Sequence, residues 1–223
     1  MTSSSQENWL IPAGLLTLSL IPVAAGVFGV VQIGGGAAIT AENARFFEAP
    51  LPIVLHVLGA TVYCVLGAFQ FSPGLRRRKP IWHRASGRML VPCGLVAALS
   101  GIWLAHRYQP VSFSGPVPAD YDGSFLYAIR VLVGLAMTLS LCLGVAAVRR
   151  GDLARHQKWM MRAYALSLGA GTQVVTHLPW FLIPSLHSEM VRTLFMGAAW
   201  AINLAVVEWL ILRNASLGVI ASR

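Results

Sequence analysis

The sequence predicts an all-α fold, an integral membrane bundle of about six transmembrane helices with both termini in the cytoplasm. Of the 223 residues, 56% are hydrophobic and 11% are charged, whereas about 25% charged residues are typical of soluble domains. Apolar stretches of about 20 residues, long enough to cross a bilayer, are separated by polar connections. These two observations indicate that most of the protein surface faces lipid.

The basic residues predict the orientation of the bundle. Thirteen of the 17 Lys and Arg lie in three patches, at residues 76–88, at residues 149–162 and in the C-terminal tail. Lys and Arg concentrate in the loops that stay on the cytoplasmic side of a membrane. The connections at 32–51 and 107–124 hold more acid, so we expect these and the turn at 184–190 on the opposite side. Both termini are then cytoplasmic.

The net charge of +9 has the same explanation. The positive charge lies beside apolar segments, and no basic surface interleaved with aromatic residues occurs elsewhere in the sequence. The lipid bilayer, with its anionic head groups, is therefore the predicted partner of this charge, and nucleic acid is not.

We expect residues 1–223 to form one polytopic membrane domain. The first span, at roughly 10–31, has no Lys or Arg before it and lacks a clear small-residue cleavage site. It is also longer than the core of a signal peptide, so we interpret it as a retained helix. The second span, at roughly 52–72, carries His56 about one turn inside its outer end.

The third span, at roughly 87–106, repeats Gly87, Gly94 and Gly101 every seven residues, a spacing that is typical of closely packed helix faces. The last three spans are long apolar runs with Trp or Tyr near their ends, where an aromatic belt meets the lipid head groups. We place these three spans at roughly 125–148, 159–183 and 191–212.

Histidines near the ends of the spans are the main candidates for a functional site, because ionisable residues are costly inside a membrane. His56 and His177 are expected within about 10 Å of the outer boundary. His83 and His156 lie about one turn before their spans on the cytoplasmic side. Two levels of paired imidazoles would suit a cytochrome with haem b, because imidazoles ligate haem iron. His56 with His177 is the predicted outer metal-ligating pair, and His83 with His156 the inner one.

The second span has a face that would accommodate such a cofactor. Tyr63 and Gln70 follow His56 at intervals of seven residues, and Gly59 and Gly67 share their face. Small residues beside a histidine leave room for a flat macrocycle in the interior of a helix bundle.

The same histidines have simpler interpretations. His83 and His156 are also expected at the head-group interface, where water satisfies both ring nitrogens. His56 and His177 are equally consistent with hydrogen bonds between helices. A Zn or Cu site at His56, His106 and His177 is a further alternative.

Three other polar residues lie within the spans. Arg130, near the outer end of the fourth span, is expected either to reach the outer surface or to meet an anionic substrate or a haem propionate. Asn203 is expected to form a hydrogen bond between helices. Glu208, near the inner end of the sixth span, is expected to pair with a basic residue of the cytoplasmic loops.

The leading functional hypothesis is therefore a haem-b-type protein that carries electrons between a quinone and a partner. The alternative is a cofactor-free transporter, or an accessory subunit bound to another membrane protein, in which the histidines titrate or form hydrogen bonds. A phosphate loop, an exposed Ser/His/Asp set and a metalloprotease motif are all absent from the sequence, so no class of enzyme is indicated. The sequence indicates no oligomeric state.

Four segments resemble a broad family of bacterial membrane proteins, catalogued as domain of unknown function 2306. These segments are HVLGA at 56–60, GAFQF at 67–71, WHRASGR at 82–88 and RHQKWMMR at 155–162. The resemblance covers roughly the second to fifth spans, and its most specific parts are the His-Arg and Arg-His loop motifs. It implies a polytopic helical protein of the bacterial cell membrane, the inner membrane where there are two, and no established activity.

Overall fold

The computed structural model describes residues 3–40, 43–107 and 123–221, and every regular element within these ranges is a helix. Five of the described helices are long and apolar enough to cross a membrane, judged by length and composition. They are α1 (Ser3–Gly34), α3 (Pro50–Ala68), α5 (Pro80–Arg107), α6 (Ser124–Arg149) and α10 (Glu189–Ala221). The predicted all-α membrane bundle is confirmed for this part of the chain.

The fifth predicted span is not one continuous helix. In place of a single helix at 159–183, the chain forms α7 (Leu153–Ser167), α8 (Gly169–Thr176) and α9 (Leu178–Leu182). The interruptions lie at Leu168 and His177, whose ψ angles are −1° and −12°, far from the value of about −42° in a regular α-helix. We refer to α7, α8 and α9 together as the broken helix.

Proline and glycine explain where this helix breaks. Pro179 lies in the first turn of α9 and has no N–H to donate to the preceding turn. A Cβ atom at Gly169 would overlap the indole of Trp200 on α10, and one at Gly171 would overlap the Leu18 backbone on α1. The two glycines therefore allow α8 to pack closely against both α1 and α10.

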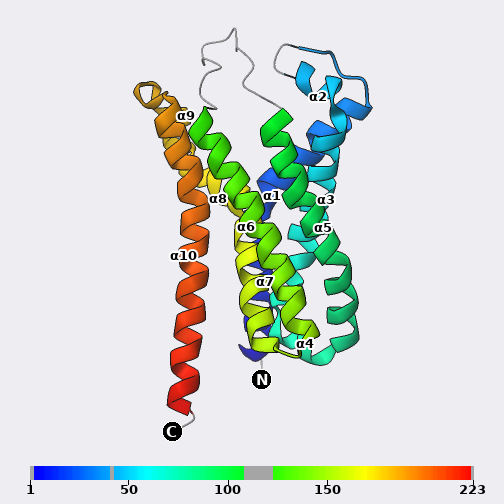
Figure 1. Cartoon of the computed structure of the whole chain (residues 1–223), viewed down its shortest axis with the longest axis vertical. Coiled ribbons are helices and arrows are strands. Elements are labelled where there is room, and N and C mark those ends of the chain that lie inside the picture. Colours follow the sequence, from blue (N-terminus) through cyan, green and yellow to red (C-terminus); the bar gives the residue numbers. More distant parts are fainter. Residues whose placement is uncertain (1–2, 41–42, 108–122, 222–223) are drawn as a thin grey trace.

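The long helices pack side by side in Figure 1, with α3 against α1 and α5, and α6 against α5 and α7. Helix α10 contacts α7 and α8, so it adjoins the broken helix. Four short elements of the described residues connect or extend the spans, namely α2 (Ala44–Glu48), α4 (Pro73–Arg78) and the 3-10 turns at Phe69–Phe71 and Pro184–Leu186.

The core of the bundle forms around two tyrosines. The rings of Tyr63 on α3 and Tyr164 on α7 lie 5.7 Å apart, and the Tyr164 hydroxyl donates a hydrogen bond to the Cys64 carbonyl at 2.6 Å. A Cβ atom at Gly94 would lie 2.7 Å from the Tyr63 ring, and one at Gly67 would lie 2.7 Å from the Tyr164 ring. The predicted glycine face of the third span therefore does pack against a neighbouring helix.

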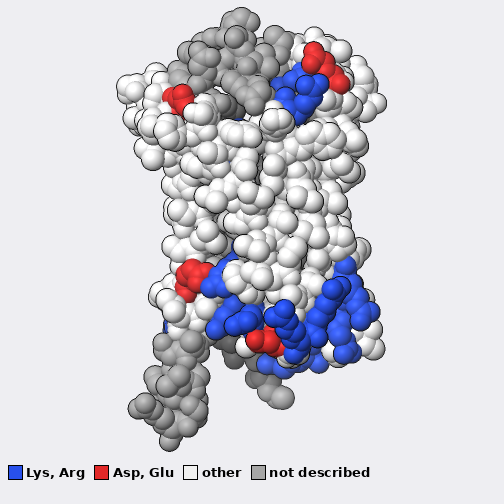
Figure 2. All heavy atoms as spheres, in the orientation of Figure 1, with Lys and Arg blue, Asp and Glu red and all other residues white. Residues whose placement is uncertain are grey.

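Charge is distributed unequally between the two ends of the bundle. Figure 1 shows the start of α1 and the end of α10 at the end of the bundle that carries α4 and the turn between α6 and α7. Figure 2 shows Lys and Arg gathered at this end, with an almost uncharged belt above it. We call it the basic end, and its exposed Lys and Arg belong to residues 76–88 and 149–158, together with Arg213 of α10. The two predicted basic loops thus lie on one side of the bundle.

Candidate functional site

A cavity of about 470 Å³ lies among the helices, within the range of small-molecule sites in proteins. Its lining comes from α1, α2, α3, α5, α6, the broken helix and α10. On α6 the lining residues run from Arg130 to Met137, and on α10 from Arg192 to Trp200. Both helices start at the end opposite the basic end (Figure 1), so the cavity occupies that half of the bundle.

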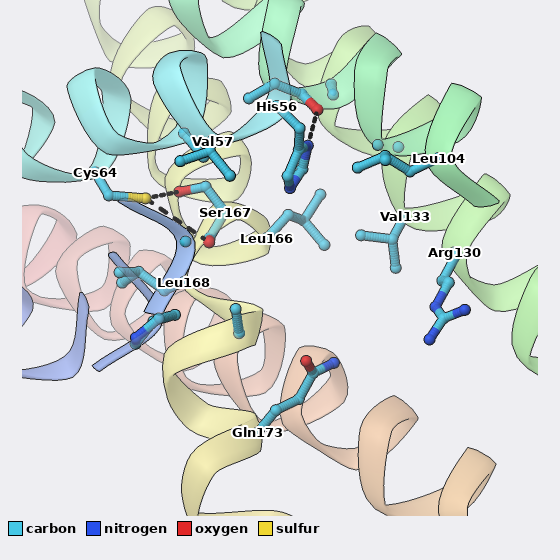
Figure 3. Close-up of a pocket in the computed structure, with 18 of the residues that line it drawn as sticks. His56, Val57, Cys64, Leu104, Arg130, Val133, Leu166, Ser167, Leu168 and Gln173 are labelled. Carbon is cyan, nitrogen blue, oxygen red and sulfur yellow. Dashed lines mark hydrogen bonds between the residues drawn. The ribbon is translucent and has the colours of Figure 1, made fainter. Parts of the chain in front are cut away.

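Figure 3 shows three polar side chains that point into this cavity from three different helices. They are His56 from α3, Arg130 from α6 and Gln173 from α8. Much of the remaining wall is apolar, with Val133 and Leu166 among the side chains directed inward. An apolar cavity with a few convergent polar groups is the usual form of a ligand site.

The imidazole of His56 is held by the backbone of the next helix. Its Nδ1 lies 2.9 Å from the Ala97 carbonyl oxygen on α5. Because a carbonyl oxygen only accepts hydrogen bonds, Nδ1 carries the proton, and in the neutral ring Nε2 keeps the free lone pair. A Cβ at Gly101 would lie 3.2 Å from the ring, so this glycine gives the imidazole its space. The other ring nitrogen faces the cavity (Figure 3).

Arg130 and Gln173 are both in contact with Met196 of α10. The Arg130 Nη2 atom lies 3.8 Å from the Met196 sulfur, which is a weak acceptor. The Gln173 side chain donates a hydrogen bond to the Met196 carbonyl oxygen at 3.3 Å. Met196 of α10 therefore contacts side chains from both α6 and α8 at the wall of the cavity.

The broken helix forms one wall of the cavity. Lining residues lie on both sides of its first interruption, from Leu166 and Ser167 through Leu168 to Gly171 and Gln173. Irregular backbone inside a membrane is tolerated where it is buried in protein or lines a cavity. Discontinuous spans often mark the binding site in membrane proteins. The sequence signals of this wall are the Gly-Ala-Gly run at 169–171 and Pro179.

Asn203 of α10 connects the two sides of that interruption. Its side-chain nitrogen donates to the Ala165 carbonyl oxygen of α7 at 3.1 Å. Its side-chain oxygen accepts a hydrogen bond from the Thr172 hydroxyl of α8 at 2.8 Å. The hydrogen bond between helices that the sequence predicts for Asn203 is confirmed, and it also stabilises the broken helix.

His177 lies in a different environment from His56. It is buried, with 8% of its surface exposed, at the second interruption of the broken helix. Its ring centre lies 5.7 Å from that of Trp180, 5.6 Å from that of Phe181 and 6.3 Å from that of Phe195. The cavity lining does not include it, and ligation of one metal by His56 and His177 stays a prediction.

The other predicted histidines lie elsewhere. His156 donates a hydrogen bond from Nδ1 to the Gly144 carbonyl oxygen at 2.9 Å, and His83 lies in the first turn of α5. Both are near the basic end, away from the cavity, and haem ligation by this pair also stays a prediction. The His106 ring contacts the Tyr127 ring, with 6.4 Å between their centres.

The predicted three-histidine metal site is not formed. Among the residues that the structure describes, no three His, Cys, Asp or Glu side chains are grouped so that they could hold one metal ion. The prediction of a Zn or Cu site at His56, His106 and His177 is therefore wrong.

Glu208 pairs with the basic loops as predicted. Its carboxylate accepts two hydrogen bonds from the Arg162 guanidinium, one of them at 2.8 Å. The Arg162 side chain also covers the Trp159 ring, at 4.6 Å from its centre. This bidentate pair joins α10 to α7 near the basic end.

No curated protein and no solved structure matches the chain at a significant level. A family described as "Predicted membrane protein (DUF2306)" matches residues 53–211, which include the cavity residues His56, Arg130 and Gln173. This match covers more than half of the chain and bears out the resemblance seen in the sequence motifs. The chain therefore belongs to the DUF2306 family of predicted membrane proteins.

Proposed function

We propose that the protein binds a small amphipathic molecule in the cavity, inside the half of the membrane opposite the basic end. The main support for this proposal is the position of three polar side chains. His56, Arg130 and Gln173, from three helices, converge on a cavity that is otherwise largely apolar (Figure 3). The polar groups would contact the head of the ligand, and the apolar wall would contact its tail.

The broken helix supports the same proposal. A continuous helix would satisfy its own backbone and would leave no irregular segment in the membrane. Here the irregular segment coincides with the cavity wall, and Asn203 satisfies backbone and side-chain groups on both sides of it. These hydrogen bonds reduce the free-energy cost of interrupting the helix at the place where a ligand would bind.

The proposed orientation places the basic end in the cytoplasm of a bacterial cell, with the chain in the inner membrane. The gathering of exposed Lys and Arg at one end supports it (Figure 2), because such residues stay on the cytoplasmic side. The cavity would then lie in the outer half of that membrane.

A pair of matched substitutions tests the binding of a ligand. Val133→Phe adds a ring to a side chain that points into the cavity (Figure 3), whereas Val148→Phe alters an exposed position of the same helix, 40% exposed. The full-length variants are purified in detergent, and small molecules in their organic extracts are compared by mass spectrometry. We expect a compound that accompanies the wild type and Val148→Phe and is lost from Val133→Phe. Equal extracts from all three proteins would contradict the proposal.

Haem-b-type electron transfer, to or from a quinone, is the second candidate. It is favoured by the hydrogen bond between His56 Nδ1 and the Ala97 carbonyl oxygen. Histidines that ligate metals usually donate their second ring N–H in this way, which orients the other nitrogen toward the metal. In this proposal His56 is an axial ligand, with His177 as its partner, and Arg130 neutralises a propionate. His83 and His156 would form the second pair.

The absorption spectrum distinguishes this candidate from other amphipathic ligands. Protein expressed with ample haem is expected to show a Soret band that His56→Ala weakens, while His187→Ala, a histidine outside the proposed pairs, leaves it intact. A purified protein without a Soret band would exclude haem binding. That result would not argue against the binding of a ligand that has no visible absorption.

A further inference from the structure

We infer that the ligand of this cavity carries a hydroxyl group, as an alcohol or a phenol, and that this group donates a hydrogen bond to Nε2 of His56. This inference rests on the proposed ligand-binding function and specifies the chemical class of the ligand. The hydrogen bonds that His56 and its polar neighbours in the wall make within the protein use their donors, and these bonds decide which atoms a ligand meets.

The His56 ring presents an acceptor to the cavity. Both hydrogen bonds recorded for the ring among the described residues, to the Ala97 carbonyl oxygen at 2.9 Å and to the Ser100 hydroxyl at 3.4 Å, involve Nδ1. Nδ1 carries the proton, because a carbonyl oxygen only accepts hydrogen bonds. An imidazolium within a span is costly, so the ring is neutral, and Nε2 turns its lone pair toward the cavity (Figure 3).

The position of this acceptor is set by the protein rather than by a ligand. The Ala97 carbonyl belongs to the interior of α5, and the Ser100 hydroxyl lies 3.2 Å from the same oxygen. A flip of the imidazole would place a carbon instead of Nδ1 at this carbonyl and would lose the hydrogen bond. Nε2 is therefore held toward the cavity before a ligand binds, which reduces the entropy lost on binding.

Two further side chains of the wall also donate to the protein. The Gln173 amide nitrogen donates to the Met196 carbonyl oxygen at 3.3 Å, which leaves the amide oxygen as an acceptor. The Ser167 hydroxyl donates to the Tyr164 carbonyl oxygen at 2.7 Å. Both residues line the cavity together with His56. A ligand without a donor would displace water from these acceptors and offer nothing in return, a cost that a hydroxyl group avoids.

A neutral donor suits this environment better than a charged one. An ammonium group also donates, but moving its charge from water into the interior of a membrane is costly. A hydroxyl group supplies a donor without that cost. Its alkyl or aryl part matches the apolar part of the wall, where Val133 and Leu166 point inward (Figure 3). An amphipathic alcohol or phenol therefore fits both parts of the cavity.

The test compares ligands in which a methyl group replaces the hydroxyl proton. Full-length protein is reconstituted in nanodiscs of zwitterionic lipid, and the binding of radiolabelled hexadecanol and of its methyl ether is measured against empty nanodiscs. A second pair, 4-pentadecylphenol and its methyl ether, distinguishes a phenol from an alcohol. We expect the hydroxyl form of at least one pair to bind about fivefold more tightly, as for one neutral hydrogen bond. The pair with the larger ratio identifies the head group.

Matched substitutions at two histidines assign the preference to Nε2 of His56. An asparagine amide reaches the position of Nδ1, so His56→Asn can keep the bond to Ala97, but it has no atom at the position of Nε2. We expect this variant to lose the preference for the hydroxyl form. His156 makes the same kind of bond through Nδ1, to the Gly144 carbonyl oxygen at 2.9 Å, and is not part of the cavity lining. His156→Asn should therefore retain the preference. Thermal unfolding shows whether each variant is folded, and the wild-type ratios decide if His56→Asn is not.

The outcomes separate this inference from the function on which it rests. Equal affinity of the wild type for the hydroxyl and ether forms of both pairs would overturn the hydroxyl group, and the binding of an amphipathic molecule would stand. A preference that survives His56→Asn would overturn the role of Nε2. If no probe binds, the inference fails, and if Val133→Phe also leaves the organic extract unchanged, the proposed function fails too.

Two other groups compete for the same nitrogen. Tighter binding of hexadecylamine than of hexadecanol would identify an ammonium head and overturn the choice of a hydroxyl group. Haem ligation would also use Nε2 of His56. A Soret band that His56→Asn removes and His156→Asn retains would place iron at this nitrogen and would likewise overturn the inference.

Discussion

Asn203 on α10 accepts a hydrogen bond from the Thr172 hydroxyl on α8, with 2.8 Å between the two side-chain oxygens. Through its amide group, the same side chain donates to the Ala165 carbonyl oxygen on α7. One residue therefore bonds to both sides of the interruption at Leu168. Since water is absent from the hydrocarbon region of a membrane, neither bond is easily replaced.

Loss of the Asn203 side chain should destabilise the bundle. We expect Asn203→Ala to lower the free energy of unfolding by about 0.6 to 1.7 kcal/mol for each of the two bonds. The measurement is unfolding by denaturing detergent. Thr172→Val removes one bond, so it should cost less in the wild type than Asn203→Ala does, and almost nothing once Asn203 is replaced. Thr138→Val is the control, because that hydroxyl bonds to the Gly134 carbonyl of its own helix. Additive effects at 172 and 203 would contradict the pairing.

The ion pair between Arg162 and Glu208 should be weak but measurable. Their side chains are 25% and 42% exposed, so solvent screens the interaction, and we expect Glu208→Gln to cost about 0.2 to 1 kcal/mol. Exchange of the two residues, Arg162→Glu with Glu208→Arg, should recover most of that loss in the same unfolding assay. The effect should decrease as salt is added. A loss that is independent of salt would point to packing rather than charge.

An added methyl group beside His56 should affect ligand binding more than stability. In Gly101→Ala, the new Cβ would lie 3.2 Å from the imidazole and would displace the ring, so we expect weaker binding of the ligand. Gly87→Ala, on the same helix, meets only the Gln70 side chain at 3.8 Å and should leave binding intact. Alanine is a better helix former than glycine by up to about 1 kcal/mol, so Gly87→Ala should raise the melting temperature. Equal binding by both variants would argue against His56 as a contact.

The proposed orientation can be checked by chemical labelling. We expect Ser185→Cys, at an exposed position of the turn before α10, to react with a membrane-impermeant maleimide added to spheroplasts. Arg77→Cys, at the basic end, should react only after the membrane is opened. The native Cys64, Cys93 and Cys142 all lie within helices α3, α5 and α6 and give the background. The reverse pattern of labelling would invert the orientation.

Much of the bundle follows from sequence patterns that act over long segments. Apolar length identifies five spans, and the clustering of Lys and Arg anticipates the basic end. Some single residues were also predictable, because a polar group inside a membrane requires a partner, as Asn203 and Glu208 show. The spans, the basic end and these polar pairs follow from the lipid environment rather than from detailed side-chain packing.

The interruption of the fifth span is where sequence reasoning was wrong, and it has a direct effect on the site. Gln173 and His177 are four residues apart, so a continuous helix would place both on one face. The His177 N–H still bonds to the Gln173 carbonyl oxygen at 2.9 Å, and the chain leaves the helical path only after His177. Gln173 lines the cavity, whereas His177 packs against Trp180 and Phe181. The cavity itself combines residues from several helices, and no periodicity within one helix predicts which of them face a common space.

The two helices on either side of α8 are attached to it in different ways. Helix α10 is held by the Asn203 hydrogen bonds and by the ion pair of Glu208. Helix α1 contacts α8 at Gly171 and Leu18, and within its described residues the recorded side-chain hydrogen bonds, from Thr17 and Ser19, go to its own backbone. The contact of α1 with α8 therefore consists of close packing, whereas α10 is joined to α8 by a side-chain hydrogen bond. A substitution that fills the space at Gly171 would act on the α1 wall of the cavity, and one that removes the Asn203 side chain would act on the α10 wall.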